Sequence, residues 1–207
     1  MAIFPIILDI SVVMEHLVNS RNRDSNDALT KDQVKRILSV IDNERDRLII
    51  ELGLYTGCRV NELATLSPNN INIGAGTIRV WDKKKDTRNG NPRPDKKYRT
   101  IDVDPPALLE EILLYQEKCK DKKRDSVLGR NYKTYERTIQ KYSKQALGFK
   151  RSWHCLRHTY ASQSLNNGRS IEYVARQMGD SEEMVARVYH QLSPEQIVKE
   201  RAIDIYK

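Results

Sequence analysis

The sequence from His154 to Ala161 reads HCLRHTYA, and the chain continues through MGDS at 178–181 to VYH at 188–190. His154 and Arg157 are three residues apart, so a helix would place both on one face. Tyr189 follows beyond two short segments with helical character. This stretch therefore contains a group suited to proton transfer (His154), a group suited to binding phosphate (Arg157) and a possible hydroxyl nucleophile (Tyr189). Other parts of the chain could complete a site around them.

The overall composition indicates one globular domain with a real core. The chain has 207 residues, of which 39% are hydrophobic and 31% charged, and a chain of this length can bury a substantial core. No apolar run is long enough to span a bilayer. The start, Met1 to Ile10, is short, contains Pro5 and Asp9, and lacks the basic region of a signal peptide. We therefore expect an intracellular protein without a membrane segment.

Positive charge is concentrated in one short segment. The formal net charge is +8, which fits either an ordinary basic surface or a polyanion partner. The segment from Asp82 to Arg99 distinguishes the two, because it holds eight basic residues (Lys83, Lys84, Lys85, Arg88, Arg93, Lys96, Lys97 and Arg99) against three acidic ones (Asp82, Asp86 and Asp95). Such a density favours contact with a phosphate backbone.

The cysteines argue against a disulfide framework or a structural zinc site. There are 3 of them, Cys58, Cys119 and Cys155, far apart and without a Cys-x-x-Cys pair, which fits a reducing compartment. His154 and His158 have the i,i+4 spacing of a zinc-binding pair, with Cys155 between them. No third and fourth ligand accompanies them, so we expect no metal.

The pattern of elements predicts a mainly helical α+β fold. A capping box at Thr30 opens the first helix, Gly57 can end the second in a left-handed turn, and short helices occupy most of the chain after residue 105. Three segments have strand character, at 71–73, 77–81 and 98–103, with the basic segment between the last two. We expect a small three-stranded antiparallel sheet, an N-terminal segment or linker at 1–28, and one domain at 29–207 that ends in an amphipathic helix.

Several motifs together resemble the tyrosine recombinases, the phage integrase family. The octapeptide TGCRVNEL at 56–63 resembles the first arginine box of that family, and HCLRHTYA at 154–161 resembles the second, His-x-x-Arg. MGDS at 178–181 resembles the Leu-Gly-His-Ser motif, and Tyr189 lies nine residues after Asp180, the family's spacing for its nucleophile. Order and spacing agree over about residues 28–200, which makes the resemblance specific.

The resemblance implies a role for each residue of these motifs. Tyr189 would attack a DNA phosphodiester and form a covalent 3′-phosphotyrosyl intermediate that stores the bond energy for rejoining. Arg59 and Arg157 would bind the non-bridging oxygens, and His154 would assist proton transfer. Glu62 corresponds to an acidic residue that supports the first arginine. Neither metal, ATP nor any other cofactor is implied.

The basic segment would supply the remaining groups. In the family, a lysine on the hairpin between the second and third strands protonates the leaving 5′ oxygen, and either Lys83 or Lys84 fits that position. The other basic residues of the hairpin are expected to contact the DNA backbone: Lys85, Arg88, Arg93, Lys96 and Lys97.

Asp180 is the main departure from the family pattern, which usually has His or sometimes Trp there to donate a hydrogen bond to the scissile phosphate. An ionised Asp cannot donate and would repel the phosphate. Three explanations stay open. Asp180 is protonated or paired with a nearby base such as Arg176; or it is turned away, with His190 or a water in its place; or the enzyme is weak or inactive.

The resemblance implies a site-specific DNA recombinase or integrase acting on double-stranded DNA. The alternatives are a DNA-binding member with impaired catalysis, and a type IB topoisomerase-like or telomere-resolving enzyme. The family's terminal helix packs on a neighbouring protomer, so we expect dimers or tetramers on DNA, with docking of that helix in cis as the alternative. The expected location is the cytoplasm at the nucleoid, or the host cytoplasm for a virus-encoded protein. Family members usually carry an N-terminal DNA-clamping domain, whereas only about 28 residues precede the expected catalytic domain here. Whether the chain is a catalytic fragment or a naturally minimal recombinase, we expect weaker and strongly salt-dependent DNA binding.

Overall fold

The computed structural model describes residues 28–81, 87–88, 91–92, 98–119, 125–129 and 131–190, with the backbone alone at 87–88, 91–92 and 188–190. The expected N-terminal segment and the expected terminal helix therefore lie outside the described residues, apart from residue 28. Within the described residues, no helix is both long and apolar enough to cross a membrane.

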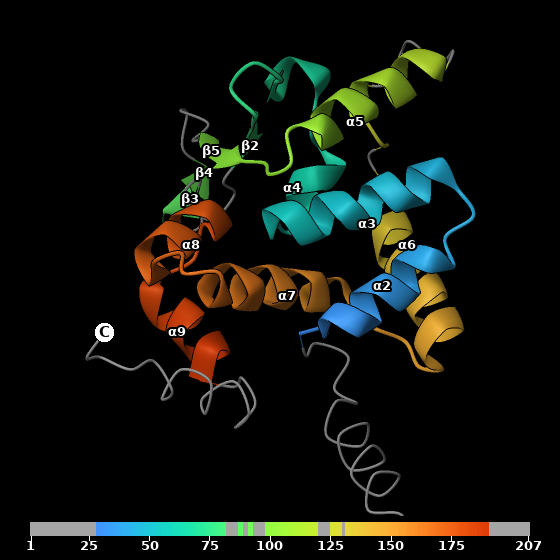
Figure 1. Ribbon diagram of the computed structural model, residues 1–207. Coiled ribbons are helices and arrows are strands. Elements are labelled where there is room, and N and C mark those ends of the chain that lie inside the picture. The colour runs from blue at the N-terminus through green and yellow to red at the C-terminus, as the bar shows by residue number, and fades with distance from the viewer. Residues whose placement is uncertain are drawn as a thin grey trace, which may run out of the picture.

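Helices make up most of the described chain, as predicted (Figure 1). They are α2 (Lys31–Ser39), α3 (Glu44–Thr56), α4 (Val60–Ala64), α5 (Ala107–Lys118), α6 (Tyr132–Leu147), α7 (Trp153–Asn166), α8 (Ile171–Met178) and α9 (Glu182–His190), with a 3-10 turn at Pro68–Asn70. The strands are β1 (Ile71–Asn72), β2 (Thr77–Trp81), β3 (Thr87–Arg88), β4 (Asn91–Pro92) and β5 (Tyr98–Asp102).

Local side-chain chemistry fixes where the helices begin. The Thr30 hydroxyl accepts from the Gln33 backbone N–H at 3.2 Å, while the Gln33 side chain accepts from the Thr30 N–H at 3.1 Å. This confirms the predicted capping box, which satisfies two backbone donors that the helix itself leaves unpaired. Asn131, Ser152 and Ser170 are the N-cap residues of α6, α7 and α8, and the side chain of each accepts one hydrogen bond from a backbone N–H of the first turn.

The sheet has the predicted three strands in the order β1-β2-β5, all antiparallel. In β2 and β5 buried and exposed residues alternate, with Ile78 and Val80 buried on one strand and Ile101 on the other. A further antiparallel pair, β3 with β4, lies inside the basic segment. The sequence did not predict this pair, because two-residue strands have no periodicity to detect.

Helix α7 joins two clusters of buried side chains. Its first half belongs to the main core, which takes in residues of α3, α5, α6 and the sheet, and its second half belongs to a smaller cluster with α8 and α9. Helix α3 packs along α7. In Figure 1 the C-terminal end of α3, helix α8 and strands β2 and β5 lie at the same end of the molecule. The residues of the two arginine motifs come together at this end.

Candidate active site

The turn that carries Arg59 is held tightly against α7. Gly57 ends α3 with a φ of 60°, as predicted, and a Cβ built on it would lie 2.5 Å from the Cδ1 atom of Tyr160. Only glycine combines that backbone conformation with so close an approach. Arg59 follows as the N-cap residue of α4, with its side chain partly exposed.

Arg157 is fixed on α7 against the same turn. Trp153, at the start of α7, donates its indole N–H to the Cys58 carbonyl at 2.9 Å, and Arg157 donates through Nη1 to the Gly57 carbonyl. The Arg157 side chain is buried. Burial lowers the pKa of its guanidinium, and the carboxylate of Asp180 opposes that shift. A buried guanidinium requires an anionic partner, since isolated charge is costly away from water.

Asp180 supplies that partner and joins the two arginines. Helix α8 ends at Gly179, whose φ is 66°, and the chain then turns so that the Asp180 carboxylate lies between the two guanidinium groups. Its Oδ1 is 2.6 Å from Nη2 of Arg59, and its Oδ2 is 2.5 Å from Nη2 of Arg157. Two arginines from helices far apart in sequence thus meet on the two oxygens of one anionic group.

Glu62 is a buried carboxylate that binds both the backbone and the side chain of Arg59. It accepts from the Arg59 backbone N–H at 2.8 Å and from Arg59 Nη1 at 3.1 Å. Arg99 of β5 donates to both Glu62 oxygens at 2.7 Å. Burial alone would raise the pKa of Glu62, but the hydrogen bonds and charges of Arg99 and Arg59 outweigh it and leave that pKa below its ordinary value.

Arg99 belongs to the site, although the sequence pattern marked it only as one of the basic residues of the loop. Its side chain is 9% exposed, and in β5 it alternates with exposed Tyr98 and Thr100, so it shares the inward face with Ile101. That alternation was the signal available in the sequence, because an arginine at an inward strand position requires a buried acidic partner.

Gln177 connects β5 to the end of α8. Its side chain donates to Asp102 Oδ2 at 2.7 Å and accepts from the Asp102 backbone N–H at 2.9 Å. Its carbonyl accepts from Nε of Arg99 at 3.2 Å. The strand that follows the basic loop is therefore attached directly to the turn that carries Asp180.

The other predicted site residues are placed only in part. His154 is exposed in the first turn of α7, three residues before Arg157. Tyr189 lies in α9, where the structure describes the backbone. The Arg88 backbone lies in β3, whereas Lys83, Lys84, Lys85, Arg93, Lys96 and Lys97 lie outside the described residues.

The metal site considered from the sequence is not assembled around Cys155. That cysteine is buried, and burial raises the pKa of its thiol to about 12. His154, one residue earlier, is exposed. Across the described part of the chain, no three His, Cys, Asp or Glu side chains are grouped so that they could hold a metal ion.

Most of the chain matches a known protein family. The family model described as the phage integrase family matches residues 27–196, which include both arginines, Asp180 and Tyr189. The chain belongs to the phage integrase family. Its resemblance to the tyrosine recombinases, which rests on three short motifs and the spacing of Tyr189, is thereby confirmed.

Within the family, the chain is similar to several Xer recombinases. The tyrosine recombinase XerA of Pyrococcus furiosus is 32% identical over 172 residues, which cover 78% of this chain and 56% of that protein. A crystal structure of a XerA recombinase matches with a TM-score of 0.69 at 24% identity, over 84% of this chain and 63% of that one. A XerH site-specific recombinase in a post-cleavage complex with its palindromic difH substrate matches with a TM-score of 0.64 at 20% identity, over 87% and 54%. These structures share the predicted fold, and the chain spans little more than half the length of the XerA relative.

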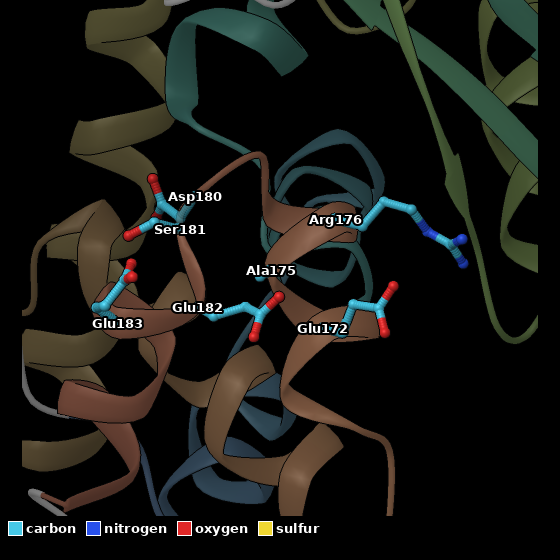
Figure 2. A pocket seen from close by; sticks show the side chains of 7 residues that line it. All are labelled: Glu172, Ala175, Arg176, Asp180, Ser181, Glu182 and Glu183. Atoms are coloured by element: carbon cyan, nitrogen blue, oxygen red, sulfur yellow. The ribbon is translucent and has the colours of Figure 1, made fainter.

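Asp180 is paired, which was one of the explanations for its departure from the family pattern, but its partners differ from the one suggested. It binds Arg59 and Arg157, whereas the guanidinium of Arg176 lies 5.5 Å from the centre of the Tyr173 ring. Figure 2 shows the Arg176 side chain directed away from Asp180. The predicted pairing with a base is confirmed, and the bases are Arg59 and Arg157 instead of the suggested example, Arg176.

Asp180 also lines an open pocket of about 510 Å³ between α8 and the start of α9 (Figure 2). The other lining residues are Glu172, Ala175, Arg176, Ser181, Glu182 and Glu183. Four carboxylates against one guanidinium make this pocket unfavourable for a phosphate. Among the described residues, the two arginines that Asp180 bridges are the basic groups next to this pocket that suit an anion.

Proposed function

We propose that this chain is the DNA-cleaving and DNA-rejoining domain of a site-specific tyrosine recombinase. The observation that carries the proposal is the convergence of Arg59 and Arg157 on the two oxygens of one carboxylate. A phosphodiester presents two non-bridging oxygens with the same single negative charge. Two guanidinium groups fixed in this way would stabilise the charge that develops on those oxygens in the transition state.

The proposed reaction is an exchange of phosphate esters. The hydroxyl of Tyr189 attacks the phosphorus, so that a bond forms between the tyrosine oxygen and the 3′-phosphate while the bond to the 5′ oxygen breaks. His154 assists removal of the tyrosine proton, and Lys83 or Lys84 protonates the departing 5′ oxygen. Attack by a 5′ hydroxyl on the phosphotyrosine reverses the sequence and rejoins DNA. The number of phosphoester bonds is conserved, so no external energy source is required.

We assign double-stranded DNA as the partner, with the basic segment along its backbone. Lys85, Arg88, Arg93, Lys96 and Lys97 are the proposed phosphate contacts, and the net charge of +8 supports a polyanionic ligand. Assembly into dimers or tetramers on DNA through the C-terminal helix, and location at the nucleoid or in the cytoplasm of a virus host, follow from the same function. The XerH complex supports DNA as ligand only by analogy, because the difH substrate is bound to XerH.

The direct test is covalent capture, which works even when the DNA site is unknown. A pool of duplexes with a randomised central segment and a nick near its centre is incubated with the protein, so that cleavage releases a short fragment and traps the adduct. Adducts that survive denaturing detergent are recovered, amplified and sequenced. We expect a recurrent sequence and a protein–DNA adduct on a denaturing gel.

The matched variants are Tyr189→Phe and Tyr132→Phe, each of which removes one phenolic hydroxyl. Tyr132 is exposed at the start of α6, so its variant should form the adduct as the wild type does, whereas Tyr189→Phe should form none. Specific DNA binding without any adduct would instead support a binding protein that has lost catalysis. Relaxation of supercoiled DNA without strand exchange between two sites would support the topoisomerase alternative.

A further inference from the structure

Asp180 accepts the hydrogen bonds that the two arginines would otherwise donate to the oxygens of a bound phosphate. The outer amino group Nη2 of each arginine carries two protons. In Arg59 one goes to the Gly179 carbonyl at 3.0 Å and the other to Asp180. In Arg157 one goes to the Met178 carbonyl at 2.9 Å and the other again to Asp180. The carboxylate thus takes the last Nη2 proton of both side chains.

We infer that Asp180 is a built-in competitor of the DNA phosphate. Its carboxylate occupies the arginine pair when no DNA is bound, and it must leave before phosphodiester oxygens can accept the same two protons. This inference rests on the proposed function, because it takes Arg59 and Arg157 to be the phosphate-binding groups. It makes Asp180 the residue that sets how tightly the pair binds an oxyanion.

Other contacts hold both arginines in position, so Asp180 is not needed to orient them. Arg157 donates to two backbone carbonyls, and Arg59 is held by Glu62 and by a third backbone carbonyl. These bonds do not involve the carboxylate at position 180. Removal of that carboxylate should therefore leave the arginine pair in place, with the Arg157 guanidinium lacking its anionic partner and one Nη2 proton of each arginine available to another anion.

Asp180 can leave without opening the core. Its side chain is 14% exposed and already borders the open pocket of Figure 2. The carboxylates of Glu172, Glu182 and Glu183 around that pocket disfavour its departure. Asp180 should therefore yield only to an anion held in addition by further contacts, as a DNA phosphate is held by the rest of the duplex, and should exclude free phosphate.

The experiment is a calorimetric titration of the whole chain with inorganic phosphate, in a chloride buffer of low ionic strength. The variant Asp180→Asn keeps the size of the side chain but removes its charge. Glu182→Gln is the matched control, because it removes one carboxylate from the same pocket but has no bond to the arginines among those described. We expect Asp180→Asn to bind phosphate at least tenfold more tightly than the wild type. Glu182→Gln eases the departure of Asp180 but leaves its carboxylate in place, so it should raise the affinity by no more than about twofold.

A second substitution tests whether the gain in phosphate affinity comes from binding at the arginine pair. In the double variant Asp180→Asn with Arg59→Gln, the added affinity should disappear. Equal affinity in wild type, Asp180→Asn and Glu182→Gln would overturn the inference, as would weaker binding in Asp180→Asn. If Asp180→Asn is unfolded without an anion, recovery of its thermal transition by phosphate supports competition, because a ligand that binds the native state stabilises it; failure of phosphate to restore the transition overturns it.

The titration is independent of catalysis. If the wild type never forms a DNA adduct but the Asp180→Asn variant binds phosphate more tightly, the proposed function is refuted while the competition between Asp180 and an oxyanion stands. A protein that forms the adduct and shows no gain in phosphate affinity would refute the competing role alone.

Discussion

Gly57 is the position at which a single methyl group should disturb both the stability of the fold and the arginine pair. An Ala there would have to adopt a φ near 60°, and its Cβ would lie 2.5 Å from Cδ1 and 2.9 Å from Cγ of Tyr160. Gly148 provides a matched control, since it has a φ of 85° and a Cβ added there would have no neighbouring atom within 4 Å. Both alanine variants place Ala in the left-handed region, so the difference between their losses of stability measures the steric clash with Tyr160 alone.

The magnitudes follow from these two terms. Left-handed backbone costs an alanine about 1–2 kcal/mol, and the reduced freedom of the unfolded chain offsets about 0.4–1 kcal/mol of this. Gly148→Ala should therefore lose roughly 1 kcal/mol. Overpacking against the Tyr160 ring adds about 1–3 kcal/mol, so Gly57→Ala should lose roughly 2–4 kcal/mol. At about 2–4 °C per kcal/mol for a protein of this size, its Tm should fall by about 4–16 °C.

The assay is thermal unfolding followed by circular dichroism, with a double variant that separates causes. In a Tyr160→Ala background the loss caused by Gly57→Ala should shrink to that of Gly148→Ala, because the two substitutions share a contact and are not additive. Gly57→Ala should also slow adduct formation, since the carbonyl of this residue accepts from Arg157. Equal losses of Tm in Gly57→Ala and Gly148→Ala would refute the steric argument.

Two further predictions concern the groups behind Arg59. The pKa of Glu62 is held below its ordinary value in the fold, so the ionised carboxylate stabilises the protein above the ordinary pKa, and this stabilisation is lost as pH falls through the lower pKa. Glu62→Gln should therefore lower the free energy of unfolding by about 3 kcal/mol at pH about 6 and by clearly less at pH about 3. Urea unfolding measures both values, and a difference that does not depend on pH would contradict this. Arg99→Lys keeps the charge but loses the bidentate contact with Glu62, so kcat for DNA cleavage should fall roughly tenfold with little change in KM. The control Arg79→Lys, on the exposed side of β2, should leave kcat unchanged. A change in KM alone for Arg99→Lys would argue against a positioning role.

Local chemistry made much of the fold readable from the sequence. The Thr30 capping box, the left-handed turn at Gly57 and the alternation in β2 and β5 each depend on neighbours along the chain, and the structure confirms all three. Three short motifs and the spacing of Tyr189 sufficed to indicate the phage integrase family, because their residue types and spacing are jointly uncommon. The β3–β4 pair was missed, because such short strands have no local signature.

The pairing of charges was decided by the tertiary structure. From the sequence, Arg176 was one example of a base that could pair with Asp180, and Arg99 was one more basic loop residue. In the fold, Asp180 reaches Arg59, 121 residues away, and Arg99 reaches Glu62, 37 residues away. Electrostatic partners depend on distance and burial, and both are set by how α7, α8 and β5 pack together. The sequence motifs therefore indicated Arg59, Arg157 and Glu62 as candidate site residues. Only the packing added Arg99 to them and decided that an acidic residue of the chain itself occupies the arginine pair.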